Sequence, residues 1–252
     1  MRKSKGLLKG RLLDLVLEDP YSNLALEEGL FIEAEVPTLR VWENQKSIVI
    51  GRAQLAKYET DLEYCRNRSI PIVRRMSAGG AVFNGPGNLN WSFFVPRNGN
   101  SPGPMGDAKS VFNSFASIVN EALRKCGVRS EFVPPNTLVD DSGKICGMAA
   151  YMSKEKVLCH GTLLVDADLQ EAQMLTRPSA TKIARRYPRS RFAHVSNCGV
   201  KRSDFVSELA GSWLGFEIEE WTAGERKATS RLVEKYRSPE WNLGDPFGGK
   251  NL

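Results

Sequence analysis

The spacing of apolar residues along the chain predicts an alternation of helices and strands. The clearest helix covers 107–126, where apolar residues recur at helical spacing and Gly127 ends the run. The clearest strand covers 89–95, where large apolar residues fall on one face, as in a half-buried strand. We expect further strands at 38–42, 47–51, 70–75, 137–140, 157–165 and 216–219, and further helices at 22–28, 57–67, 204–214 and 223–236.

The order of these elements indicates the fold class. Strands come as neighbouring pairs with helices between the pairs, which favours a mixed α+β sheet over the strand–helix alternation of a doubly wound fold. The 252 residues suffice for one large domain or two small ones, and the sequence contains no internal repeat and no low-complexity tract. The stretch 97–106 is rich in Gly, Pro, Asn and Ser and is expected to form a surface loop.

The composition is that of an ordinary soluble globular protein, with 25% charged and 41% hydrophobic residues. The chain lacks the run of about 18 apolar residues that a membrane span requires. The N-terminal segment 1–11 is basic but has no apolar signal core, which predicts a cytoplasmic protein. The five cysteines form no Cys-x-x-Cys pair and are expected to be reduced thiols. With only two histidines in addition, we expect no metal site built by the protein.

The formal net charge of +6 leaves two interpretations open. It suits an anionic partner, such as a nucleic acid, a nucleotide or an acidic protein, and it equally suits a solvated basic surface. The Lys and Arg residues are spread along the chain, and no nucleic-acid-binding signature accompanies them. We therefore expect no nucleic-acid partner.

A glycine-rich stretch at 74–83 is the first candidate for chemistry, and it reads Arg-Arg-Met-Ser-Ala-Gly-Gly-Ala-Val-Phe. Small residues allow a ligand to approach the backbone and allow consecutive N–H groups to point at one anion. Arg75 would neutralise a phosphate, and Ser77 would donate one more hydrogen bond. The stretch matches neither a Walker loop nor a dinucleotide fingerprint, and a Gly-Gly pair between strands is also typical of a plain hairpin or bulge.

Two further segments combine polar and small residues. An Asp-Ser-Gly turn places Lys144 just after a predicted hairpin tip, beside the small residues Gly147 and Ala149. A lysine after a turn is also commonly exposed and without function. The apolar strand at 157–165 is interrupted by His160-Gly161-Thr162. A lone histidine in such a strand is often a hydrogen-bonded core residue rather than a catalyst.

These three segments together resemble the lipoate–protein ligase A family, which shares its fold with biotin–protein ligase and with octanoyl transferases. The resemblance covers nearly the whole chain. It implies one catalytic domain over 1–252, with an α+β fold of mixed, largely antiparallel sheets flanked by helices. The matching segments, which follow one order, are 23–28, 39–42, 49–52, 74–83, 87–90, Asn136, 144–147, 160–164, 189–191 and 240–242.

The resemblance implies a two-step reaction. Lipoate and ATP give lipoyl-adenylate and pyrophosphate, and a lysine of an acceptor protein then attacks the adenylate. By the family pattern, Arg75 and the backbone of 80–83 hold the nucleotide. Lys144 lies between the carboxylate and the phosphate, where an ammonium stabilises the developing charge. The other ligand-binding residues expected from the resemblance are Ser77, Gly79, Gly80, Ala81, Val82, Phe83, Asn136, Gly147, Ala149, His160, Gly161 and Thr162.

The same reaction sets the expected ligands and partners. Mg²⁺ is expected to accompany ATP. The acyl chain needs an apolar tunnel, for which the alternation of apolar residues suggests Trp42, Val49, Val82 and Phe93. Larger family members continue beyond Trp241-Asn242 with an accessory domain, which some relatives carry as a separate protein. We therefore expect a lipoyl-acceptor domain and an accessory subunit as partners, and poor adenylate formation without the latter.

Three positions depart from the family pattern. Ala78 stands where the first of three glycines is usual, and its methyl group would narrow the loop. Asn84 replaces a histidine, so a proton relay is not expected at that position. Cys146 stands where serine is common.

Two alternatives to a ligase remain open. An octanoyl transferase moves an acyl group between carrier proteins through a thioester and needs a nucleophilic thiol. In the cysteine-dependent transferases that thiol precedes the lysine loop, where this chain has Glu131-Phe132-Val133-Pro134 and no cysteine between Cys126 and Lys144. The second alternative is a module that binds lipoyl-adenylate without catalysis. Biotin is not expected as substrate, because the loop lacks the Gly-Arg-Gly-Arg arrangement of biotin ligases.

Overall fold

The computed structural model describes residues 10–97, 106–175, 186–213 and 215–248. Its larger sheet has eight strands in the order β11-β1-β2-β6-β10-β9-β8-β7. The β11–β1 and β1–β2 pairs are parallel and the other pairs are antiparallel, which confirms a mixed, largely antiparallel sheet. The strands are β1 Gly10–Asp14, β2 Thr38–Trp42, β6 Asn88–Pro96, β7 Glu131–Val133, β8 Thr137–Asp140, β9 Gly143–Met152, β10 Lys156–Leu164 and β11 Phe216–Ile218.

A smaller sheet of three strands has the order β4-β3-β5, in which β3 is parallel to β4 and antiparallel to β5. Its strands are β3 Ser47–Ile50, β4 Ile72–Arg74 and β5 Val82–Asn84. The helices are α1 Pro20–Glu33, α2 Leu62–Asn67, α3 Ala108–Lys125, α4 Leu169–Leu175, α5 Arg202–Gly211, α6 Ala223–Arg237 and α7 Pro239–Leu243, with a 3₁₀ turn at Ala56–Tyr58.

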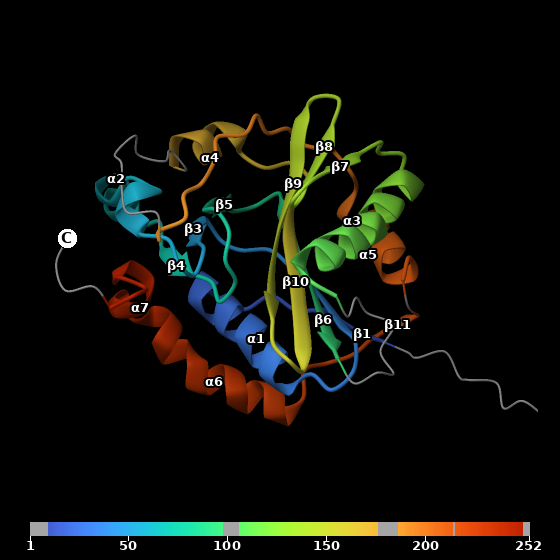
Figure 1. The fold of residues 1–252 in the computed structure, drawn as a ribbon, viewed down its shortest axis with the longest axis horizontal. Coiled ribbons are helices and arrows are strands. Elements are labelled where there is room, and N and C mark those ends of the chain that lie inside the picture. Colours follow the sequence, from blue (N-terminus) through green and yellow to red (C-terminus); the bar gives the residue numbers. More distant parts are fainter. Residues whose placement is uncertain (1–9, 98–105, 176–185, 214, 249–252) are drawn as a thin grey trace, which may run out of the picture.

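Helices cover both faces of the larger sheet (Figure 1). On one face, α3 and α5 bury the main apolar core, in which Phe93 stacks on Phe115. On the other face, α1 packs through Leu26 and Leu30 against Phe94. All nine residues of β6 are buried. The prediction of a half-buried strand at 89–95 is therefore wrong, because the face opposite Phe93 is covered by α1 and by the pocket described below.

Side-chain caps explain where the helices begin. Asp107 accepts a hydrogen bond from the backbone N–H of Ser110 at 2.9 Å, and α3 follows as predicted. Asp19 caps α1 in the same way, so this helix starts earlier than the predicted 22–28. The predicted helix at 57–67 is divided, because Asp61 caps a new helix, α2, after the 3₁₀ turn.

Several elements escaped prediction or lie outside the described residues. The strands β1 and β7 and the helices α4 and α7 carry too few periodic positions to predict. Helix α5 is shifted toward the N-terminus relative to the predicted 204–214. The predicted loop at 97–106 falls almost wholly on residues that the structure does not describe. None of the described helices is long and apolar enough to cross a membrane.

Candidate active site

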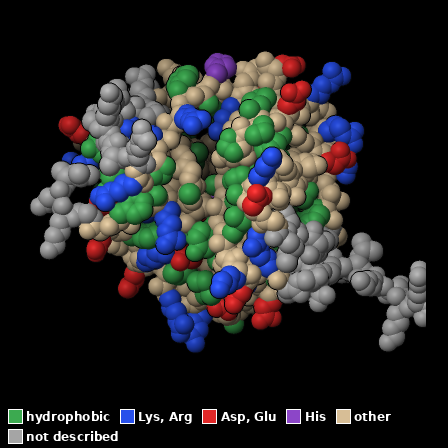
Figure 2. Space-filling view, in the orientation of Figure 1, with side chains coloured by type: hydrophobic (Ala, Val, Ile, Leu, Met, Phe, Trp, Pro, Cys, Tyr) green, Lys and Arg blue, Asp and Glu red, His purple; other side chains and the backbone are tan. Residues whose placement is uncertain are grey.

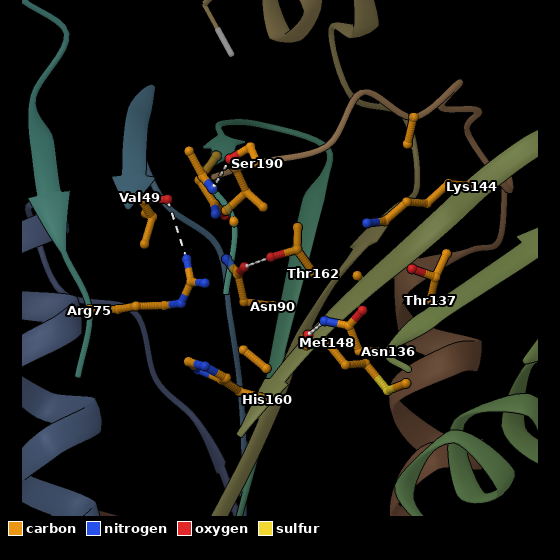
Figure 3. Close-up of a pocket in the computed structure, with 18 of the residues that line it drawn as sticks. Val49, Arg75, Asn90, Asn136, Thr137, Lys144, Met148, His160, Thr162 and Ser190 are labelled. Carbon is orange, nitrogen blue, oxygen red and sulfur yellow. Dashed lines mark hydrogen bonds between the residues drawn. The ribbon is translucent and has the colours of Figure 1, made fainter. Parts of the chain in front are cut away.

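A cavity of about 470 Å³ is lined by residues from both sheets. It opens as a hollow near the centre of the face shown in Figure 2, with Lys and Arg side chains around it. Most of the residues expected to bind ligand line this cavity (Figure 3), although they come from distant parts of the sequence. They are Arg75, Gly80, Ala81, Val82, Asn136, Lys144, Gly147, Ala149, His160, Gly161 and Thr162.

Three of the expected ligand-binding residues do not line the cavity. The side chain of Phe83 packs with Ile48 and Ile50 in a separate apolar cluster. Ser77 is fully buried, and a Cβ added at Gly79 would lie 2.7 Å from Nη2 of Arg75. The suggested acyl tunnel needs one correction as well. Trp42, Val49 and Val82 do line the cavity, whereas Phe93 faces the main core.

Arg75 provides a buried cation on one side of the cavity. Its guanidinium donates to the Val49 carbonyl at 3.4 Å, the Ser77 hydroxyl at 3.0 Å and the Ala78 carbonyl at 2.8 Å. Burial lowers the pKa of Arg75 to about 10, so the group remains charged near neutral pH. The charge of Glu27 opposes this shift, but no salt bridge joins Arg75 to a carboxylate of the described chain, so the guanidinium can bind an anionic ligand.

A chain of hydrogen bonds holds Arg75 in place. The hydroxyl of Ser77 lies 2.7 Å from Nε2 of His160, and Nδ1 of His160 lies 2.8 Å from Oε1 of Glu27. Ser92 donates to the same Glu27 oxygen at 2.6 Å. Burial alone would raise the pKa of Glu27, but the charge and hydrogen bonds of His160 and Ser92 lower it overall. Glu27 is thus an ionised hydrogen-bond acceptor. His160 is hydrogen-bonded through both ring nitrogens and links Glu27 to the glycine-rich loop.

Lys144 lies on the opposite side of the cavity from Arg75 (Figure 3). The start of β9 is fixed there, because the backbone N–H of Lys144 donates to the His194 carbonyl at 2.8 Å and its carbonyl accepts from Ser196 at 3.0 Å. The ammonium rests over Gly147, where an added Cβ would lie 2.9 Å from Nζ. Burial lowers the pKa of Lys144; Cys146 opposes this shift and Arg75 adds to it. Lys144 is therefore not the exposed, incidental lysine of the alternative interpretation.

The glycine-rich loop is held by two close contacts. A Cβ at Gly51 would lie 2.1 Å from the carbonyl oxygen of Gly79, so only glycine permits this approach. The backbone N–H of Ala81 donates to the Ser190 hydroxyl at 2.7 Å, and Ser190 also accepts from Gln54 at 3.1 Å. The N–H of Ala81, which we expected to contact the nucleotide, is thus already bonded within the protein.

Sequence reasoning missed part of the cavity wall. The residues that it did not assign to the site are Leu24, Glu27, Asn84, Asn90, Ser92, Pro134, Pro135, Thr137, Met148 and 189–193. Several of them occur in segments that carry the family resemblance, namely 23–28, 87–90 and 189–191. That resemblance was the available signal for them. The segment 189–193 is distant in sequence from every other part of the site, so no local pattern indicated it.

The cavity contains no thiol. None of the five cysteines, all of which lie in described residues, lines it. Cys146 is fully buried in the main core, and burial raises its pKa to about 12. Cys126 caps the end of α3 and packs against the same core. A thioester mechanism therefore lacks a nucleophile at this site.

The family assignment comes from comparison with known proteins. The lipoyl protein ligase A/B catalytic domain matches residues 19–199, which include every segment that lines the cavity. The chain belongs to this family. A curated relative, lipoate–protein ligase 1 of Staphylococcus aureus, is 31% identical over 240 residues, covering 90% of this chain and 71% of the relative.

Solved structures share the fold. A bi-partite lipoate protein ligase from Thermoplasma acidophilum, studied with its E2 lipoyl domain, has a TM-score of 0.82 and 25% identity, over 97% of this chain and 99% of that one. A lipoate–protein ligase A bound with ATP has a TM-score of 0.80 and 26% identity, over 94% of this chain and 99% of that one. The expected family and fold are therefore confirmed.

Proposed function

We propose that this protein is a lipoate–protein ligase that forms lipoyl-adenylate from lipoate and ATP and transfers the lipoyl group to a lysine of an acceptor domain. The observation that carries the proposal is the pair of cations, Arg75 and Lys144, on opposite sides of one cavity. Neither has a salt bridge within the described chain. Two cations arranged in this way suit a reaction that brings a carboxylate and a phosphate together.

The proposed reaction has two steps. In the first, a carboxylate oxygen of lipoate attacks the α-phosphorus of ATP, and pyrophosphate leaves. In the second, the amine of the acceptor lysine attacks the acyl carbon, loses a proton, and AMP leaves. Lys144 acts in both steps as a fixed cation beside the acyl–phosphate link, so it needs no nucleophilic, neutral form.

The cavity walls suggest how the ligand lies. Leu24, Trp42 and Val49 form an apolar wall on the side of Arg75, which suits the acyl chain. Asn136 and Thr137 lie on the side of Lys144, where they add polar groups beside the acyl–phosphate link. The amide of Asn136 is oriented by its hydrogen bond to the Met148 carbonyl at 2.6 Å.

Mg²⁺ fits this site only as a companion of ATP. Glu27 is the one carboxylate among the described cavity residues, and it already accepts hydrogen bonds from Ser92 and His160. No group of three His, Cys, Asp or Glu residues that could hold a metal occurs in the described chain. Mg²⁺ commonly binds substrate phosphates and water with few protein ligands. We propose that ATP brings it, and we assign it no protein ligand.

Two protein partners belong to the proposal. One is the acceptor domain that carries the target lysine. The other is an accessory subunit. The bi-partite lipoate protein ligase of Thermoplasma acidophilum supports this proposal, because this chain is similar to 99% of the matched chain of that ligase. A cytoplasmic location, where ATP and reduced thiols coexist, completes the proposal.

A lipoylation assay tests the function. We expect purified protein with lipoate, ATP and an acceptor domain to release pyrophosphate and to add a lipoyl mass to the acceptor, with a higher rate when the accessory subunit is present. Single cysteine-to-alanine variants should keep this activity, since no thiol lines the cavity. Transfer that needs an acyl-carrier donor, needs no ATP and is abolished by one of these substitutions would identify a transferase instead. Adenylate binding without any turnover would identify a binding module.

A further inference from the structure

Two buried asparagines in the cavity wall each have a side-chain atom without a hydrogen-bond partner among the described residues. These atoms are Nδ2 of Asn90 and Oδ1 of Asn84. Asn90 is 4% exposed and Asn84 is 2% exposed. Buried polar groups in folded proteins almost always have a partner. An unpartnered donor in the wall of a ligand cavity therefore indicates a contact with the ligand.

Thr162 binds one end of the Asn90 amide. The two residues are directly paired across β10 and β6, and the Thr162 hydroxyl donates to Oδ1 of Asn90 at 2.7 Å. With Oδ1 bound in this way, Nδ2 points away from Thr162. Figure 3 shows Asn90 between Arg75 and Lys144. Asn90 thus lines the same cavity as the two cations and lies between them in this view.

The two unpartnered atoms differ in their hydrogen-bonding chemistry, so only one of them can bind a carboxylate. The amide group of Asn90 is a donor, which a carboxylate oxygen can accept. The orphan atom of Asn84 is an acceptor, which repels a carboxylate oxygen. Val49, Asn90 and Lys144 line the same cavity, so an acyl chain that lies against Val49 and extends toward Lys144 can bring its carboxyl group to Asn90.

We propose that Nδ2 of Asn90 donates a hydrogen bond to an oxygen of the acyl carboxyl group, and that Thr162 is the positioning residue that orients this donor. The proposal rests on the proposed function, because it takes lipoate as the acyl ligand. It gives Asn90 a role in recognising the acyl head group that is separate from the charge of Arg75 and Lys144.

The test compares three variants with the wild-type protein. The double variant Asn90→Leu/Thr162→Val replaces both polar partners with apolar groups of similar size, which limits the cost to folding. Thr162→Val removes only the hydroxyl, and Thr162→Ser keeps it. Dissociation constants for lipoate and for ATP are measured separately by calorimetry. The side-chain ¹⁵N–¹H₂ signals of Asn90 are followed by NMR as lipoate is added.

We expect the double variant to bind lipoate about 10- to 100-fold more weakly, as for the loss of a hydrogen bond to a charged group. Affinity for ATP should change less than about threefold, because the proposal gives ATP no contact with Asn90. Thr162→Val should lose part of the lipoate affinity, and Thr162→Ser should restore it. The Asn90 amide signals should shift with lipoate in the wild-type protein.

Unchanged lipoate affinity in the double variant would overturn the proposal, as would a loss confined to ATP. If the double variant does not fold, unshifted Asn90 signals in the wild-type protein and equal affinity in Thr162→Val overturn it. A wild-type protein that binds no lipoate would refute the proposed function and this inference together. Normal wild-type binding with unaffected variants would refute the inference alone.

Discussion

Replacing Lys144 with methionine is expected to slow lipoyl-adenylate formation by at least about 100-fold, because one fixed donor at a developing charge typically contributes 10²–10³ in rate. Methionine keeps an unbranched apolar side chain as far as Cε and lacks the ammonium, which lies over Gly147. Lys144 is the only lysine among the described residues that line the cavity. Pyrophosphate release at saturating lipoate and ATP measures the effect.

Lys154→Met is the matched control, since Lys154 is exposed in the turn between β9 and β10. It should keep wild-type activity. The pH dependence adds a second signature. Because burial lowers the pKa of Lys144, the wild-type rate should fall as pH rises through a value below the ordinary 10.5. A loss of less than about threefold in Lys144→Met would contradict the role assigned to this cation.

Arg74→Met is expected to lower the free energy of unfolding by about 3–5 kcal/mol, because several buried backbone carbonyls lose their hydrogen-bond donor. Arg74 is 1% exposed, and burial lowers its pKa to about 10. Its guanidinium joins the loop after β3 to the C-terminal helix α7. The backbone carbonyls that accept its hydrogen bonds are Gly51, Arg52, Gln54, Trp241, Asn242 and Gly244.

Methionine would leave these carbonyls without their donor inside the protein, which is costlier than losing a solvated contact. Denaturant unfolding of the wild-type protein and the variant measures the difference. Arg66→Met is the control, because Arg66 is exposed on α2, and it should change stability by no more than about 0.5 kcal/mol. Equal stability of Arg74→Met and wild type would show that solvent or a rearranged chain satisfies the carbonyls.

The sequence predicted the parts of the site that are set by local chemistry. A turn before Lys144, small residues at Gly147 and the polar interruption at His160 are each visible in a short stretch, and all three line one cavity. Their meeting in space was predicted only by the family resemblance. Pairing of β10 with both β6 and β9 brings them together, and such long-range pairing has no local signal.

The errors have a common physical cause. Alternation identifies the two faces of a strand, but it does not reveal what covers the second face. Phe93 was therefore assigned to the acyl tunnel, although its face of β6 packs on α3. Asn90 and Ser92, which line the cavity from the other face, were not assigned to the site. Ser77 was expected to touch the ligand, whereas its hydroxyl connects Arg75 to His160.

The most direct test of the account is a crystal structure with an unreactive lipoyl-adenylate analogue. We expect the acyl–phosphate link to lie between Arg75 and Lys144, with Nζ of Lys144 about 3 Å from an oxygen of that link. The acyl chain should lie against Trp42 and Val49. An analogue bound elsewhere, or a Lys144 ammonium turned to solvent away from the bound link, would contradict the account.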